Sequence, residues 1–315
     1  MRAIPLLSLL LGGWCVIPAH AGEAQDWLNR LSQAEQQQSF QGTFVYERNG
    51  SFSTHNIWHR VQDGKIRERL LQLDGSAQEV MRIDGRTQCV SGTLIAGLGN
   101  TPDGTARALD PQKLKNWYDL AVIGKSRVAG RQAVIVALTP KDQHRYGFEL
   151  HLDKETGLPL KSLLLNDKGQ LLERFQFTRL NITSPSDADL QASAECTAVA
   201  QDPNKATAVK TAWRSDWLPP GFELTSSVAR NDPDTKVQVS SLMYDDGLAR
   251  FSVFLEPLNG ATATDTRTQL GPTAAVSRRL TTPQGEMMVT VVGEIPIGTA
   301  ERIALSMRSD VAAAK

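Results

Sequence analysis

The chain has 315 residues, and its 34 basic and 34 acidic side chains leave it with no formal net charge. This balance argues against a nucleic-acid-binding protein, which is expected to carry a basic surplus. With 41% hydrophobic residues, a chain of this length can bury the core of one large domain or two ordinary ones, so disorder is not predicted.

The first 21 residues are predicted to be a cleavable export signal. Arg2 supplies a positive start, an apolar stretch follows, and Ala19-His20-Ala21 gives the small-x-small pattern for cleavage after Ala21. The alternatives are a membrane anchor and a lipoprotein signal at Cys15. The apolar run is shorter than the roughly 20 residues of a spanning helix, and Trp14 is too large for the position before a lipoprotein cysteine. We therefore expect a soluble protein in a bacterial periplasm.

A helix is predicted over about residues 24–37, where apolar side chains recur at helical spacing. From Phe40 the period changes to two. Hairpin turns are indicated at four places: Asn49-Gly50, Asp63-Gly64, Asp74-Gly75 and Asp84-Gly85. This spacing predicts an antiparallel meander of five strands that ends near Gly92.

The glycine-rich segment 93–110 is predicted to be a loop that could act as a lid. A short helix is expected from Pro111, with Asp110 as its N-cap, and further strands follow to about residue 180. A sheet of about ten strands must curl or close. The predicted fold class is therefore α+β, mostly antiparallel β, with a large curled sheet or unclosed β-barrel that carries helices on its concave side.

Hydrophobic periodicity disappears over residues 181–204, which predicts a division into two domains. The expected order is a β domain over 22–197, a linker over 198–210, and a smaller antiparallel domain with a C-terminal helix over 211–315. Cys89 and Cys196 remain after export. They are expected to form a disulfide, although two unpaired buried thiols would also fit the sequence.

Catalytic and metal-binding motifs do not emerge from the sequence. His55 and His59 are four residues apart, but on a strand this places them roughly 13 Å apart, too far to share a metal. We therefore predict a binding protein and not an enzyme, with no cofactor and no metal. The aromatic residues of the first domain are the better lead, either as ordinary core or as a hydrophobic lining for a lipid. The candidate lining comprises Phe44, Tyr46, Trp58, Trp117, Phe148, Phe175 and Phe177.

Four segments resemble the MucB/RseB family of periplasmic regulators: SFQGTFVYERNGSFSTHNIWH (39–59), DQHRYGFELHLDKETGLPLKSLLLNDKGQLLERFQF (142–177), WLPPGF (217–222) and YDDGLARFSVFLEP (244–257). The resemblance implies a protein that binds the periplasmic segment of a MucA- or RseA-like anti-sigma factor and shields it from site-1 proteolysis. It also implies release by lipid or lipopolysaccharide, and a first domain similar to the lipoprotein carriers LolA and LolB.

The anti-sigma segment is expected to contact the second domain and the interdomain groove. Trp213, Trp217 and Phe222 are expected to be exposed aromatic residues and are the candidate contacts, because tryptophan is enriched at binding hot spots. Packing between the domains is the alternative for these three residues. Two rival functions are a lipoprotein or lipid carrier, which would not need the second domain, and a hydrolase, which no motif supports. A homo-oligomer remains open.

Overall fold

The computed structural model describes residues 19–76, 78–92, 109–199, 207–208, 212–231, 237–283 and 285–309. Residues 1–18 of the predicted export signal, most of the expected lid at 93–110 and most of the expected linker lie outside these residues. The first helix, α1 (Ala19–Gln37), includes the predicted cleavage point and extends to the predicted C-terminal end.

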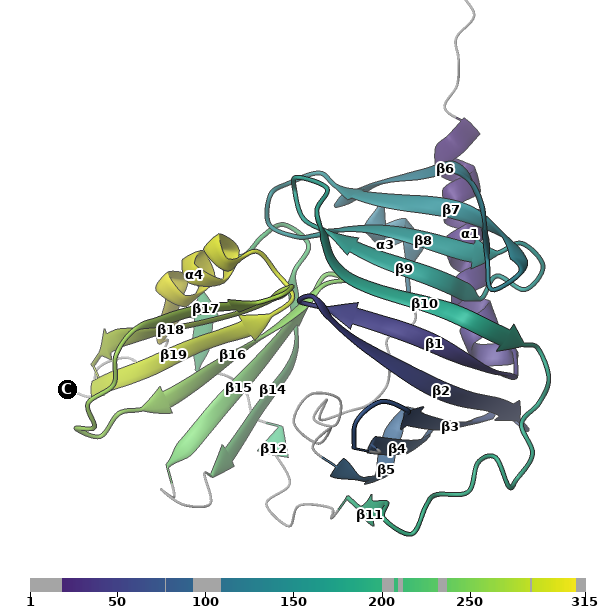
Figure 1. Cartoon of the computed structure of the whole chain (residues 1–315). Coiled ribbons are helices and arrows are strands. Elements are labelled where there is room, and N and C mark those ends of the chain that lie inside the picture. The colour runs from purple at the N-terminus through teal and green to yellow at the C-terminus, as the bar shows by residue number, and fades with distance from the viewer. Residues whose placement is uncertain are drawn as a thin grey trace, which may run out of the picture.

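The larger sheet is antiparallel and has the strand order β11-β5-β4-β3-β2-β1-β10-β9-β8-β7-β6 (Figure 1). Its strands are β1 (Phe40–Arg48), β2 (Ser51–Gln62), β3 (Lys65–Gln72), β4 (Gln78–Ile83), β5 (Arg86–Val90), β6 (Tyr118–Val128), β7 (Arg131–Pro140), β8 (Gly147–Asp153), β9 (Pro159–Leu165), β10 (Leu171–Asn181) and β11 (Thr197–Ala198). The pairing of β1 with β10 joins two meanders, one from each half of the domain.

The predicted hairpin turns form because their residues accept positive φ. At the β1–β2 turn, Asn49 has φ 53° and Gly50 has φ 74°. Two consecutive residues in this region match the twist of the flanking strands, which favours Asn-Gly. The turn sets the register, so that Tyr46 lies opposite Ser53 and Phe44 opposite His55.

One face of the large sheet carries α1, and we call it the inner face. Trp27, Leu28 and Leu31 of α1 pack there on β6, β7 and β8, while Ala34 joins a neighbouring core on β1 and β10. The short helix α3 (Pro111–Leu114) starts as predicted, because the Asp110 carboxylate accepts backbone hydrogen bonds from the first turn.

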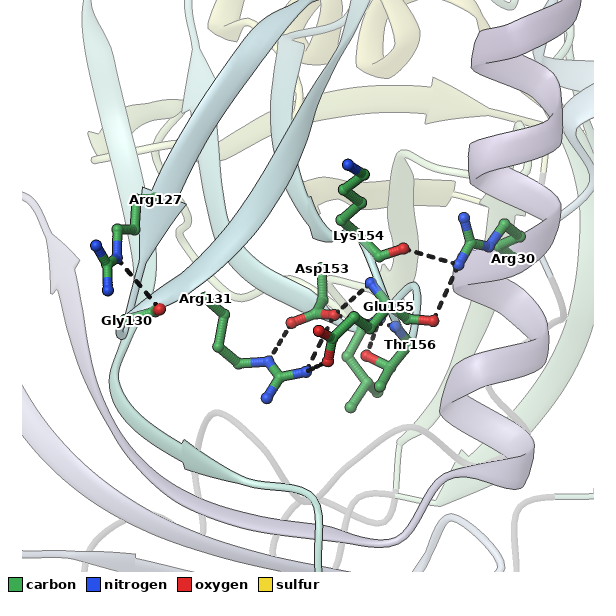
Figure 2. A network of polar contacts seen from close by, with 9 residues as sticks. Arg30, Arg127, Gly130, Arg131, Asp153, Lys154, Glu155 and Thr156 are labelled. Carbon is green, nitrogen blue, oxygen red and sulfur yellow. Dashed lines mark hydrogen bonds and ion pairs between the residues drawn. The ribbon is translucent and has the colours of Figure 1, made fainter.

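A polar network fixes α1 to the turn after β8 (Figure 2). Arg30 of α1 donates to the carbonyls of Lys154 and Glu155, both at 3.1 Å. The buried Asp153 carboxylate is paired with Arg131 and accepts two backbone N–H groups of the same turn. Burial opposes its ionisation, but these hydrogen bonds hold the pKa of Asp153 below its ordinary value.

A strap, residues 182–196, crosses the opposite, outer face of β2–β4. Arg60 pairs with Asp187 at 2.7 Å, and Arg69 donates to the carbonyl of Asp189 at 3.1 Å. At its end the strap is joined to β5 by a disulfide between Cys89 and Cys196. The strap is therefore held to the first domain before the chain continues to the second.

The smaller sheet has the order β12-β14-β15-β16-β19-β18-β17, and a separate pair joins β13 to β20. Its core is closed by α4 (Ile297–Ser306), whose buried side chains pack on β18 and β19. The strands are β12 (Thr207–Ala208), β13 (Trp213–Ser215), β14 (Glu223–Asn231), β15 (Gln238–Asp245), β16 (Arg250–Pro257), β17 (Thr266–Leu270), β18 (Thr273–Thr282), β19 (Gly285–Gly293) and β20 (Met307–Ser309). The predicted fold class, a large unclosed antiparallel sheet plus a smaller sheet with a C-terminal helix, is confirmed.

Candidate binding sites

Four of the candidate lining aromatics lie together on the inner face. Phe44 is opposite Phe177 across β1 and β10, and Tyr46 is opposite Phe175. The Phe44 and Phe175 ring centroids are 4.7 Å apart, and those of Phe175 and Phe177 are 5.1 Å apart. Phe44 and Phe177 are buried in the core with Ala34 of α1, whereas Tyr46 and Phe175 are half-buried beside it. Only the half-buried pair keeps surface available to a ligand.

Phe148 also lies on the inner face and packs against the core under α1. Trp58 does not, and its place in the expected lining is corrected. It pairs with Gln41 and Arg69, whose side chains point to the outer face, and the Arg69 guanidinium lies 5.0 Å from its ring centroid. Trp117 is corrected as well. It precedes β6 and contacts Gly221 of the second domain, so it lines the domain junction.

Side chains fill most of the inner face that the structure describes. A hollow of about 40 Å³ remains between β2, β3 and β4, lined by Ile57, Leu70 and Val80 with Glu68 and Arg82. Pockets that hold drug-sized ligands are roughly 300–1,000 Å³. An acyl chain could enter here only if side chains or α1 moved.

Two buried histidines lie beside this hollow. The His55 ring stacks on Phe44 at 5.0 Å between ring centroids, and the His59 ring stacks on Phe40 at 4.8 Å. His59 Nδ1 is 2.9 Å from a Glu68 oxygen. Burial lowers the pKa of His55. The lowered pKa favours the neutral form of the His55 ring, while His59 lies beside the Glu68 carboxylate.

The junction between the domains has a polar centre around a fully buried arginine, which we call the Arg145 cluster: Arg145, Asp142, Asp246, Tyr118 and the carbonyl of Pro220. The Arg145 guanidinium is 2.5 Å from Asp246 and 2.9 Å from Asp142, and it donates to the carbonyl at 2.6 Å. The Arg145 and Asp246 side chains have no exposed surface. Burial raises the pKa of Asp246, while backbone N–H groups and Arg145 oppose this. One arginine thus ties both domains together.

Aromatic rings enclose this cluster from both domains. The Arg145 guanidinium lies 5.1 Å from the Phe222 centroid and 5.6 Å from that of Tyr118. The Trp117 indole lies so close to Gly221 that a Cβ there would be 2.2 Å from its Cε2 atom. Glycine is required at this position, which also has a φ of 87°.

The three candidate partner contacts in the second domain are packed and not exposed. Phe222 is only 5% exposed and belongs to the core. Trp217 is half-buried between the Arg302 guanidinium, at 3.8 Å from its ring centroid, and the His144 ring, at 5.0 Å. Trp213 packs against the same core. The expectation of exposed aromatics is therefore wrong for Phe222, and packing at the junction accounts for Phe222 and Trp217.

A second contact joins the domains closer to solvent, where the β1–β2 turn meets the β17–β18 turn. Arg48 is bonded to Thr273 and lies 3.2 Å from Glu294, both in the second domain, and 3.8 Å from Glu173. A hollow of about 220 Å³ opens beside it. Burial and Glu173 raise the pKa of Glu294. This contact is polar and accessible, unlike the Arg145 cluster.

The described residues show no group of three or more His, Cys, Asp or Glu side chains placed to hold a metal ion. Within the same residues, no helix is both long and apolar enough to cross a membrane. The chemistry available at both domain contacts is reversible binding through ion pairs, hydrogen bonds and apolar surface.

The similarity to known proteins extends over the whole chain. The MucB/RseB N-terminal domain family matches residues 23–199, and the MucB/RseB C-terminal domain family matches residues 207–308. The sigma factor AlgU regulatory protein MucB of Pseudomonas aeruginosa is 63% identical over the full length of both chains. The P. aeruginosa MucA/MucB complex superimposes with a TM-score of 0.83 at 63% identity, over 92% of this chain and 100% of that one. MucB alone gives 0.68 at 61% identity, over 91% and 98%. The chain belongs to the MucB/RseB family.

Proposed function

We propose that this protein binds the periplasmic segment of a membrane-bound anti-sigma factor of the MucA type and protects it from site-1 proteolysis. By doing so it keeps a stress sigma factor inactive. The proposal places the protein in the periplasm, to which the segment 1–21 would direct it. The observation that carries it is the full-length likeness to MucB, whose solved structures include complexes with MucA.

The domain arrangement supports the same proposal. Family likeness extends over both domains, and the Arg145 cluster holds them in one fixed orientation. That orientation superimposes better on the MucA-bound structure than on MucB alone, with TM-scores of 0.83 and 0.68. A simple carrier of the LolA or LolB type would need neither the second domain nor a buried junction, so the carrier function is the weaker candidate.

Binding and protection can be tested together. Purified protein lacking residues 1–21 is titrated with the periplasmic segment of P. aeruginosa MucA, and the segment is then exposed to its site-1 protease with and without the protein. We expect saturable binding and slower cleavage. Absence of binding at micromolar concentrations, with a correctly folded protein, would contradict the proposal.

We further propose that an acyl chain of lipid A enters the inner face and acts as the release signal. Ile57, Leu70 and Val80 form an apolar strip beside the half-buried Phe175 and Tyr46. Replacing Ile57 and Leu70 with Asn should weaken binding of a fluorescent fatty acid, whereas Leu305→Asn on the exposed side of α4 should not. Equal affinity in both variants would place the lipid elsewhere.

A further inference from the structure

The hollow at the Arg48 contact is built by both domains. Its lining residues come from the β1–β2 turn, from the start of β10 and from the β17–β18 turn: Glu47, Asn49, Gly50, Leu171, Leu172 and Gly271. A Cβ on Gly271 would lie 3.4 Å from Arg48 Cγ and 3.6 Å from Asn49 Cβ. The hollow therefore exists only while these two turns touch, and the tip of the β1–β2 hairpin is at the meeting point of the two sheets (Figure 1).

The ion pairs at this contact divide between the two faces of the large sheet. Glu47 pairs with Arg174 across β1 and β10, whereas Arg48, the next residue of β1, faces the other way with Glu173 and Glu294. Glu47 Oε2 is buried and lies 3.3 Å from Arg174 Nε, but the geometry leaves both atoms without a hydrogen bond within the described part of the chain. A basic group from a partner would supply the missing donor to the Glu47 oxygen.

Each domain places one exposed apolar side chain next to a residue that lines the hollow. Phe52 lies directly opposite Glu47 in the β1–β2 register and is 64% exposed. Leu270 precedes Gly271 and is 62% exposed. These are the two most exposed large hydrophobic side chains that the structure describes. Single exposed apolar residues are common, but here one from each domain adjoins a lining residue of the same hollow.

We propose that this surface, the Arg48 seam (Glu47, Phe52, Leu171, Leu172, Leu270 and Gly271), is the docking site for a stretch of the anti-sigma segment that carries a Lys or Arg beside an apolar side chain. The basic group pairs with Glu47, and the apolar side chain packs between Phe52 and Leu270. The proposal rests on the proposed function for the identity of the partner. Because both domains supply the seam, the partner binds this domain arrangement in preference to any in which the turns are apart.

The test uses the protein without residues 1–21 and the periplasmic segment of P. aeruginosa MucA. Phe52→Ser combined with Leu270→Ser should weaken binding roughly tenfold or more, as expected for central apolar contacts. Both side chains are mostly exposed, so the fold should survive. Ile123→Ser combined with Leu305→Ser is the matched control, because these residues are 55% and 56% exposed away from the seam. The control should bind as the parent protein does.

The charge is tested separately. Glu47→Lys should weaken binding, and replacing one basic residue of the segment with Glu should restore it; Glu256→Lys, on an exposed position of β16, is the control. If the Phe52/Leu270 and Glu47 variants bind the segment as tightly as the parent protein does, the seam is not its docking site. The proposed function would still stand. A change in oligomeric state with unchanged segment affinity would assign the seam to a second copy of the chain and also overturn the proposal. A parent protein that binds no segment at all would instead contradict the proposed function.

Discussion

Both contacts between the domains are arginine–carboxylate ion pairs, but one is buried and the other is partly exposed to solvent. In the Arg145 cluster the guanidinium has no exposed surface and is enclosed by aromatic rings. At the second contact, which borders the Arg48 seam, the Arg48 side chain is 34% exposed and the Glu294 side chain 47% exposed. A buried charge that loses its partner is costly, whereas an exposed pair contributes little. The cluster is therefore suited to fixing the domain arrangement, and the seam is suited to exchanging partners.

The largest effect is expected from Arg145→Met. It leaves the Asp246 carboxylate and the Pro220 carbonyl without their charged partner in the junction. Breaking a buried pair in this way lowers the free energy of unfolding by about 3–5 kcal/mol, which urea unfolding would measure. The double variant Arg145→Met, Asp246→Asn should recover part of this loss. A loss below about 1 kcal/mol, the range of exposed pairs, would remove the distinction between the two contacts.

A smaller effect is expected from Gly221→Ala. The new Cβ would collide with the Trp117 indole, and the positive φ of this residue adds backbone strain. Overpacking of this kind costs about 1–3 kcal/mol. Gly130→Ala is the matched control, because Gly130 has φ 77° and nothing within 4 Å of the added atom. If both variants lose the same stability, Trp117 is not tightly packed against the second domain.

Arg48→Met should change stability least among these substitutions. Its partners are partly solvated, and exposed ion pairs contribute roughly 0–1 kcal/mol. Urea unfolding of this variant beside Arg145→Met compares the two contacts directly. A cost as large as that of Arg145→Met would show that the seam is also a structural clamp.

The sequence predicted the hairpin-rich sheet because its turns are local. Asn49-Gly50 and the Asp-Gly pairs specify positive φ without help from the rest of the chain. The same turn also determines on which face of the sheet Trp58 lies. Counting back from Asn49-Gly50 places Trp58 opposite the polar Gln41 and not opposite Phe40. The error came from grouping aromatic residues by type without following the alternation of the strand.

The junction could not be predicted in the same way. Arg145 and Asp246 are 101 residues apart, and neither has an unusual local setting. All four segments that resemble the family contain a junction residue: Arg48, Arg145, Gly221 and Asp246. Their meeting point depends on how the two sheets dock, which no local pattern encodes. The same docking buries Phe222, which sequence composition alone presents as an exposed hot spot.

The smallest effect is expected from protonation of His144, which lies at the edge of the Arg145 cluster. It tests whether the buried and the exposed contact differ in their response to pH. The Nδ1 atom of His144 lies 3.1 Å from the Thr299 hydroxyl of the second domain. Burial, with Arg302 and Arg145 adding to it, lowers the pKa of His144, while Asp142 opposes this. Because the folded pKa lies below the unfolded value of about 6.5, the unfolded state binds more protons, so this contribution to stability is present above about pH 6.5 and is lost as the pH falls below it.

Acidification should therefore loosen the junction through His144 before it disturbs the seam. A fluorophore pair placed one on each domain should report partial separation below about pH 6.5, and His144→Gln should reduce this response. His151→Gln is the matched control, since burial also lowers the pKa of His151 but its partners Ser126 and Glu149 lie within the large sheet. The control should alter the pH dependence of unfolding without altering the interdomain signal. An unchanged interdomain response in His144→Gln would mean that proton uptake by another group drives the separation.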